Sequence, residues 1–295
     1  MYPQTLDNSE VLKGICVSPP YFAFDHVVRH GSAEVSGGVN AQTAATREPA
    51  PISGAEAGRH LAILGTVAAS LANPKPGRHY YLARRALLVR LDDGRVTRPA
   101  GLTAQAEAHF EDRRVARAQG TLSADGEAVY SLDVRYDVLP EPTFLRIFGA
   151  HRRWTGGSGR SGPSAYATAP PLDVLEPDAT AWAAELSSVT AEHCPGHFED
   201  HPALPVAVVM GVLSGLAADC LAGRLQRPSL QVQVMRAEVV AHALAFAGER
   251  VRFEARSTPL EEGAGVENTG LSGFRCVAAG SRGRVGEMGL VLRTL

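Results

Sequence analysis

The sequence predicts an α+β fold in which one unit of helix and sheet occurs twice in tandem. Two long apolar segments, 52–73 and 205–225, have the composition of buried helices, and each is preceded by one β-strand candidate and followed by several. Between the two sets lies the segment 155–171, which is rich in Gly, Ser and Pro and nearly free of aliphatic residues, as linkers are. The chain of 295 residues is long enough for two modest domains.

The first helix candidate, 52–73, is apolar on every face after His60. Its end is predicted by the Pro and Gly residues of 74–77, because proline does not continue a helix. The strand candidates of this half are 35–43 before the helix and 79–91, 102–110, 113–122 and 128–138 after it, with Asp-Gly turn signals at 93–94 and 125–126.

The second helix candidate, 205–225, is again apolar on every face, and a helix of this kind must be enclosed by other elements. A long helix wrapped by a strongly curved antiparallel sheet meets that requirement. Strand, buried helix and then several antiparallel strands is the element order of the hotdog fold, so the sequence predicts a tandem (double) hotdog. The second-half strand candidates are 181–189, 230–240, 250–256, 273–279 and 286–292; the predicted domains are 1–150 and 176–295, joined by a linker at 151–175.

Composition excludes several classes of protein. Hydrophobic residues make up 45% and charged residues 20% of the chain, which excludes a disordered chain, and a net charge of −2 argues against binding of nucleic acid or anionic membrane by bulk charge. No signal peptide and no membrane-spanning segment is recognisable. The sequence thus predicts a cytoplasmic protein without a disulfide scaffold or zinc ribbon, because its four cysteines lie far apart: Cys16, Cys194, Cys220 and Cys276.

One string stands out directly before the second helix. Residues 194–205 read CPGHFEDHPALP. This string resembles the 3-hydroxyacyl-thioester dehydratases of fatty acid synthesis, which carry G-H-F-x-x-x-P-x-x-P just before their central helix. The residues that fit the motif are Gly196, His197, Phe198, Pro202 and Pro205.

The chemistry of the string can also be argued from its residues. Pro205 presets the first helical turn, whose free N–H groups near Val206 and Ala207 can bind a thioester carbonyl at the positive end of the helix dipole. A histidine just upstream, His197, is placed to remove a proton from the carbon next to that carbonyl. The alternative for His197 is a structural role in a turn. The residues expected to contact substrate are Gly196, Phe198, Pro205, Val206 and Ala207.

The sequence departs from the resembled family at one important position. The family has a Glu or Asp six residues after the second motif proline, where this chain has Gly211. Because dehydration also needs a proton donor for the departing hydroxyl, we expect His197 to work with a polar residue of the first helix. The opposite site, which would face Gly211, is expected to be inactive.

The partner on the first helix is ambiguous. One alignment places Arg59 at the acid position, but arginine does not donate a proton near neutral pH. A second alignment, with a short deletion, favours Glu56, although Ser53-x-x-Glu56 is also a capping box. His60 lies four residues after Glu56 on the same helical face and could orient its carboxylate or act as the acid. The predicted catalytic residues are therefore His197, Glu56 and His60.

No metal or other cofactor is predicted. The spacing of His193, Cys194, His197 and His201 matches no established zinc pattern. Basic residues at 151–153 and at 84–85 are either solvated surface or contacts for the phosphates of coenzyme A or a carrier protein.

Taken with the resemblance, these residues predict dehydration of a 3-hydroxyacyl thioester carried by acyl carrier protein or coenzyme A. The fused, asymmetric chain suggests polyketide or other specialised metabolism of the fatty-acid type, by analogy alone. The alternatives are a hotdog thioesterase, another thioester chemistry (cyclisation, isomerisation or decarboxylation), or a non-catalytic carrier-binding subunit. No nucleic acid or membrane partner is expected, and the chain is either a monomeric pseudo-dimer or a homodimer.

Overall fold

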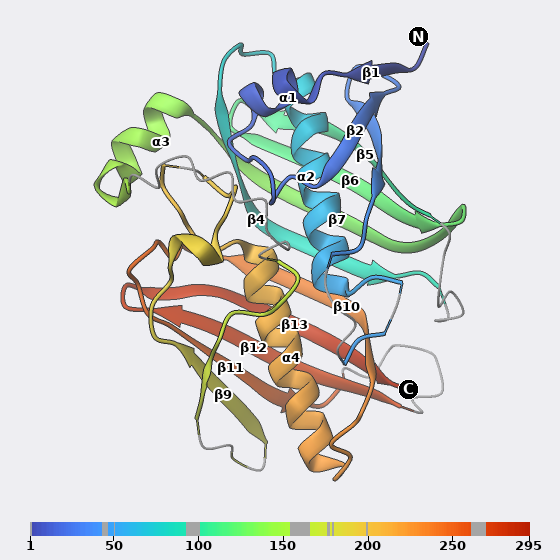
Figure 1. Cartoon of the computed structure of the whole chain (residues 1–295), viewed down its shortest axis with the longest axis vertical. Helices are drawn as coiled ribbons and strands as arrows, with labels where there is room; N and C mark the ends of the chain where they lie inside the picture. Colours follow the sequence, from blue (N-terminus) through green and yellow to red (C-terminus); the bar gives the residue numbers. More distant parts are fainter. Residues whose placement is uncertain are drawn as a thin grey trace.

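The computed structural model describes residues 2–42, 47–49, 51–92, 101–153, 166–175, 178, 180–198, 200–260 and 270–295. Within these residues a single antiparallel sheet of 13 strands carries two long helices, α2 (Gly54–Ala72) and α4 (Val206–Arg224) (Figure 1). The sheet order is β1-β2-β3-β5-β6-β7-β4-β10-β13-β12-β11-β9-β8. The two halves of the chain therefore share one continuous sheet.

The remaining elements of the first half are β1 (Gln4–Leu6), α1 (Asn8–Gly14), β2 (Phe24–Arg29), β3 (Glu34–Val39), β4 (His79–Arg90), β5 (Leu102–Asp112), β6 (Val115–Ala124), β7 (Glu127–Pro140) and α3 (Glu141–Phe148). Those of the second half are the short 3-10 helix η1 (Gly149–His151), β8 (Asp173–Val174), β9 (Ala181–Leu186), η2 (Ala191–His193), β10 (Val232–Ala241), β11 (Val251–Thr258), β12 (Leu271–Gly280) and β13 (Gly283–Thr294).

The strand order repeats between the halves. In the first half it runs β3-β5-β6-β7-β4, and in the second half β9-β11-β12-β13-β10, so each strand occupies the place of its counterpart in chain order. The halves meet where β4 pairs antiparallel with β10, from Arg236 opposite Val89 to Val240 opposite Arg85. Each half also places its long helix against its own strands.

The helices are buried because their sequences leave no polar face to expose. Helix α2 lies close to the sheet at Gly65, where an added Cβ would lie 2.7 Å from the Tyr136 hydroxyl and 2.8 Å from the Ala118 Cβ. Tyr136 donates a hydrogen bond to the Ala62 carbonyl at 2.7 Å, which fixes the helix on β7. By length and composition α4 could cross a membrane, but 56% of that stretch is buried inside the molecule.

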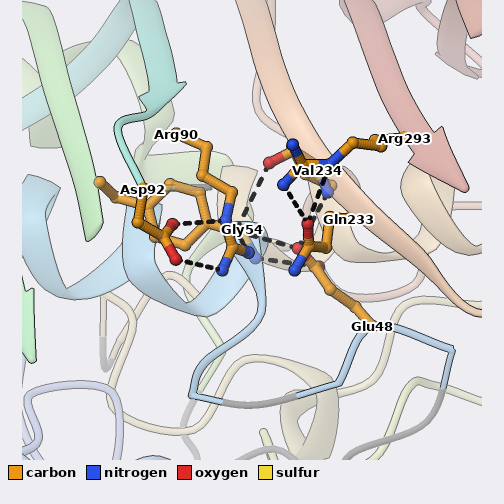
Figure 2. A network of polar contacts seen from close by, with 8 residues as sticks. Glu48, Gly54, Arg90, Asp92, Gln233, Val234 and Arg293 are labelled. Atoms are coloured by element: carbon orange, nitrogen blue, oxygen red, sulfur yellow. Dashed lines mark hydrogen bonds and ion pairs between the residues drawn. The ribbon is translucent and has the colours of Figure 1, made fainter. Parts of the chain in front are cut away.

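A polar network fixes the start of α2 at the junction of the halves (Figure 2). The carboxylate of Glu48 accepts hydrogen bonds from the Gly54 N–H at 3.0 Å, the Val234 N–H at 3.1 Å and the Tyr130 hydroxyl at 3.0 Å. Burial raises the pKa of Glu48, while these donors oppose that effect. Arg90 donates to Tyr130 at 3.0 Å and pairs with Asp92. Glu48 thus links the first turn of α2 to β10 of the other half.

Most predicted elements are observed to within a few residues, and the exceptions are informative. The elements β1, α1, β2, α3 and β8 were not predicted. Four of them are too short to show a helical or strand period, whereas β2, as long as the predicted β3 and β9, has no regular alternation of apolar and polar residues. The predicted linker contains one buried residue at its described end. Tyr166 in that segment is only 8% exposed and contacts the N-terminal half, whereas residues 154–165 lie outside the described part of the chain.

Candidate functional site

The imidazole of His197 is held in one orientation beside the start of α4. Its Nδ1 lies 2.8 Å from the Ala203 carbonyl oxygen, two residues before the N-cap Pro205. A carbonyl only accepts hydrogen bonds, so Nδ1 carries the proton and Nε2 keeps its lone pair. Within the described residues no hydrogen bond occupies Nε2. His197 can therefore act as a proton acceptor at Nε2.

Burial sets the charge of this histidine. His197 is 8% exposed, and loss of hydration lowers its pKa to about 4, with the Ala203 hydrogen bond opposing the shift. The imidazole is thus neutral at physiological pH. A neutral, oriented imidazole is the form that general-base catalysis requires.

The glycine before His197 has a backbone role that the sequence did not reveal. Gly196 has φ +75°, and an added Cβ would lie 2.1 Å from the Ser18 carbonyl oxygen. The Ser18 N–H donates to the Gly196 carbonyl at 2.8 Å, and the Phe198 N–H donates to the Cys16 carbonyl at 3.2 Å. Gly196 therefore permits a close approach of the N-terminal segment around Ser18. This contact explains the glycine without the predicted contact with substrate.

Phe198 lies in a second apolar cluster. Its ring contacts those of Tyr80 and Phe144, with centroids 5.2 and 5.6 Å apart, and its backbone has φ +57°. Packing under α3 thus accounts for the side chain that was predicted to contact substrate.

The first turn of α4 presents free backbone donors. The Val208 and Val209 N–H groups donate to the Pro205 carbonyl at 3.0 and 3.1 Å. No described group accepts from the N–H of Val206 or Ala207, and both residues are partly exposed. This turn, which begins three residues after the Ala203 carbonyl that holds His197, can therefore bind a carbonyl oxygen or an oxyanion.

A cluster of buried polar side chains lies at the start of α2. Glu56 Oε1 accepts from the Gln42 N–H at 2.5 Å and lies 3.5 Å from both Arg59 Nη2 and His60 Nε2. Arg59 Nη2 also donates to Gln42 Oε1 at 2.6 Å. Ser53 caps the helix by accepting from the Glu56 N–H at 3.3 Å, whereas the Glu56 carboxylate contacts Gln42, Arg59 and His60. Of the predicted capping box, the described contacts thus include the Ser53 half only, and the Glu56 carboxylate is buried in the polar cluster.

Two atoms in this cluster lack partners. Arg59 is 3% and His60 0% exposed, yet no described group forms a hydrogen bond with Arg59 Nε or His60 Nδ1. Burial lowers the pKa of both side chains, and Glu56 opposes the shift in each. Because buried polar atoms are normally satisfied, these two require an explanation.

Two tyrosines connect this cluster with His197. The Tyr21 ring lies edge-on to the His197 ring at 4.8 Å between centroids and to the Tyr166 ring at 5.3 Å. Tyr166 donates to the Pro195 carbonyl at 2.8 Å, and the Arg59 guanidinium lies over its ring at 4.9 Å. Burial raises the pKa of Tyr21 to about 12, so its hydroxyl is protonated near neutral pH.

The two helices align by their caps. Both α2 and α4 contain 19 residues, with N-caps Ser53 and Pro205, so the sixth residue after each cap is Arg59 in α2 and Gly211 in α4. The helices touch near their starts, because a Cβ added at Gly211 would lie 3.6 Å from the Ala55 Cβ. Arg59 thus occupies the position in α2 that is equivalent to that of the missing acid in α4, as the first of the two sequence alignments predicted.

The predicted pairing of His197 with an acid is not observed. Within the described residues, neither Glu56 nor His60 makes a hydrogen bond or ion pair with His197. Sequence reasoning also missed Tyr21, Tyr166 and Gln42. Only the aromatic run at 21–24 gave a signal, because Tyr166 lies in the predicted linker and Gln42 in a polar loop.

The remaining candidates are occupied or inert. The described residues contain no group of three or more His, Cys, Asp or Glu side chains that could hold a metal ion, and the absence of a cofactor remains a prediction. Burial raises the pKa of Cys194 to about 12, which argues against a thiolate nucleophile. Arg84 pairs with Asp137 at 3.0 Å and Arg152 with Asp200 at 3.0 Å, so each basic segment already has a carboxylate partner.

Comparisons with known proteins identify the fold. No model of a known protein family matches the sequence, and no curated protein is similar to it in sequence. Among solved structures, a conserved protein of unknown function with a hot dog fold from Alicyclobacillus acidocaldarius matches 95% of this chain and 99% of its own, at 12% identity and a TM-score of 0.54. The chain has the hotdog fold.

Two structures of named activity are similar to the same extent. An acyl-ACP thioesterase from Bacteroides thetaiotaomicron covers 88% of this chain and 98% of its own, at 11% identity and a TM-score of 0.56. A 12:0-ACP thioesterase from Umbellularia californica covers 94% of this chain and 100% of its own, at 9% identity and a TM-score of 0.56. Both are thioesterases, so the resemblance to dehydratases rests on the motif around His197 alone.

Proposed function

We propose that this protein is a tandem of two hotdog units that hydrolyses acyl thioesters carried by acyl carrier protein or coenzyme A. The observation that carries the proposal is the environment of His197. Its Nδ1 is held by the Ala203 carbonyl, three residues before the free N–H of Val206, its Nε2 keeps a lone pair, and no carboxylate among the described residues contacts it. Hydrolysis needs one base, one oxyanion site and water, and this environment supplies the two protein components.

The proposed reaction proceeds in two steps. His197 Nε2 takes a proton from a water molecule, whose oxygen attacks the thioester carbonyl carbon, and the resulting oxyanion accepts hydrogen bonds from the Val206 and Ala207 N–H groups. The C–S bond then breaks, and the leaving thiolate receives the proton held by the His197 imidazolium. The products are the free acid and the free thiol.

Dehydration is less well supported than hydrolysis. It would require a proton donor close to the substrate hydroxyl, and Glu56 is engaged by Gln42, Arg59 and His60. Arg59, at the equivalent of the acid position, does not donate a proton near neutral pH. The thioesterase activities of the structurally similar enzymes favour hydrolysis, by analogy of fold alone. A cytoplasmic location and a role in specialised metabolism remain predictions.

Product identification tests the proposal. The protein is incubated with saturated and 3-hydroxyacyl thioesters of coenzyme A and of acyl carrier protein, and mass spectrometry follows free acid and enoyl thioester in the same reaction. His197→Asn is the control, because its amide N–H can still donate to the Ala203 carbonyl. Free acid that depends on His197 supports hydrolysis. An enoyl product would instead establish dehydration, and no turnover of any thioester would contradict both enzyme hypotheses.

A further inference from the structure

The unpartnered atom of Arg59 lies in a position that a substrate can explain. Its Nε is buried and has no acceptor among the described residues, while Nη2 contacts Gln42, Glu56 and His60. A charged guanidinium N–H left unpaired in the interior is costly, so the atom calls for an explanation, of which a bound ligand is one. The acceptor missing here would be an oxygen atom.

Arg59 is linked to α4 and to His197 by a short series of contacts. It follows Gly58, where an added Cβ would lie 3.8 Å from Met210 Cε of α4. Its guanidinium lies 4.9 Å from the centre of the Tyr166 ring, which contacts Tyr21, which in turn contacts His197. Arg59 and the proposed base therefore each contact one ring of the same aromatic pair.

The charge of the cluster indicates which kind of oxygen fits. Glu56 and Arg59 already form a buried pair of opposite charge, and burial favours the neutral form of His60. A carboxylate bound there would add a second negative charge that no described cation balances, which is unfavourable in the interior. A keto or hydroxyl oxygen would satisfy the Arg59 N–H without adding charge.

We propose that Arg59 binds a neutral oxygen, keto or hydroxyl, on the acyl chain, so that the preferred substrates are oxygenated acyl thioesters. The inference rests on the proposed function and narrows its substrate class. A site built to hydrogen-bond a substrate oxygen discriminates strongly against the analogue that lacks it, because the protein donor is then left unpaired.

The test compares coenzyme A thioesters of one chain length. Hexanoyl, 3-hydroxyhexanoyl, 3-oxohexanoyl, 5-oxohexanoyl and adipoyl thioesters are assayed for kcat/KM of thiol release. We expect at least one hydroxy- or oxo-substrate to exceed hexanoyl by about 10- to 100-fold, the effect of one hydrogen bond to a charged group. Adipoyl, which carries a carboxylate, should not exceed hexanoyl.

Variants connect the preference with Arg59. The double substitution Glu56→Gln and Arg59→Met removes both charges together. In this variant the kcat/KM for the preferred oxygenated thioester, divided by that for hexanoyl, should fall to within about threefold of one. The ratio is independent of the fraction of folded protein. Arg117→Met, which removes an exposed arginine paired with Asp133 on the sheet, is the matched control and should leave the ratio unchanged.

Each outcome separates the two proposals. Equal turnover of hexanoyl and every oxygenated substrate by the natural protein overturns the role of Arg59 and leaves thioester hydrolysis standing, even if the double variant does not fold. A preference for adipoyl overturns the neutral-oxygen assignment, and a preference retained in the double variant overturns the assignment to Arg59. No turnover of any of the five thioesters would contradict the proposed function itself.

Discussion

The protonation of His197 provides a prediction that follows directly from its burial. With a pKa of about 4, the imidazole is neutral in about 90% of molecules at pH 5, whereas an ordinary histidine with a pKa of 6.5 would be neutral in only about 3%. If His197 is the base, kcat/KM for thioester hydrolysis should remain nearly constant from pH 7 to pH 5 and decline only near pH 4. An ordinary histidine would instead cause a loss of about 30-fold by pH 5.

The same burial affects stability. Because the pKa of folded His197 lies below its unfolded value, its stabilising contribution is complete above pH 6.5 and is lost as the pH falls towards 4. A shift from 6.5 to about 4 corresponds to about 3 kcal/mol at most. The assay is urea unfolding of the natural protein and of His197→Asn at pH 7 and pH 5, since their difference removes the contributions of the other histidines.

One result would refute this reasoning. A midpoint of kcat/KM near pH 6.5, together with a pH dependence of unfolding that is the same in His197→Asn, would mean that His197 is hydrated and not buried as described.

Three further predictions concern other parts of the site. Gly196→Ala would bring a Cβ 2.1 Å from a backbone oxygen, whereas Gly248, with φ +93°, has open space around it. Gly196→Ala should therefore lower the unfolding free energy by at least about 1 kcal/mol more than Gly248→Ala, and equal losses would contradict the described contact. Glu48→Gln should cost about 1–3 kcal/mol in urea unfolding, because its amide would face donors; a loss below about 0.5 kcal/mol would exclude the proposed link between the halves. Cys194 should resist a thiol reagent in the native state, and rapid labelling would argue against its burial.

Much of the fold could be predicted because its two helices are apolar on every face. Such helices must be enclosed by other elements, and the order of the strand candidates around them left few ways to build a sheet that encloses each helix. The caps and breakers at Ser53 and at 74–77 fixed the ends of the first helix. Short elements such as α3 escaped prediction, because eight residues carry too little periodicity and their stability comes from contacts with distant rings such as that of Phe198.

The candidate site was predictable only in part. The position of His197 before a helix start follows from local sequence, since the prolines and the glycine are its neighbours in the chain. Its surroundings do not, because Tyr21 and Tyr166 are 176 and 31 positions away in the sequence and come together only through the fold. Chemistry favoured Glu56 as the partner, whereas the alignment of the helix caps places Arg59 at the equivalent position.

The central claim is that His197 is the base of a thioester hydrolase, and a pair of matched variants tests it most directly. His197→Asn and His193→Asn are compared with the natural protein in kcat/KM for thiol release from one acyl thioester. His193 belongs to the same segment, but its Nδ1 accepts from the Thr190 N–H at 3.1 Å, a contact that Asn can retain. We expect His197→Asn to lose about 10²- to 10⁴-fold and His193→Asn to remain within about threefold of the natural protein. Hydrolysis by folded His197→Asn at the natural rate would contradict the account.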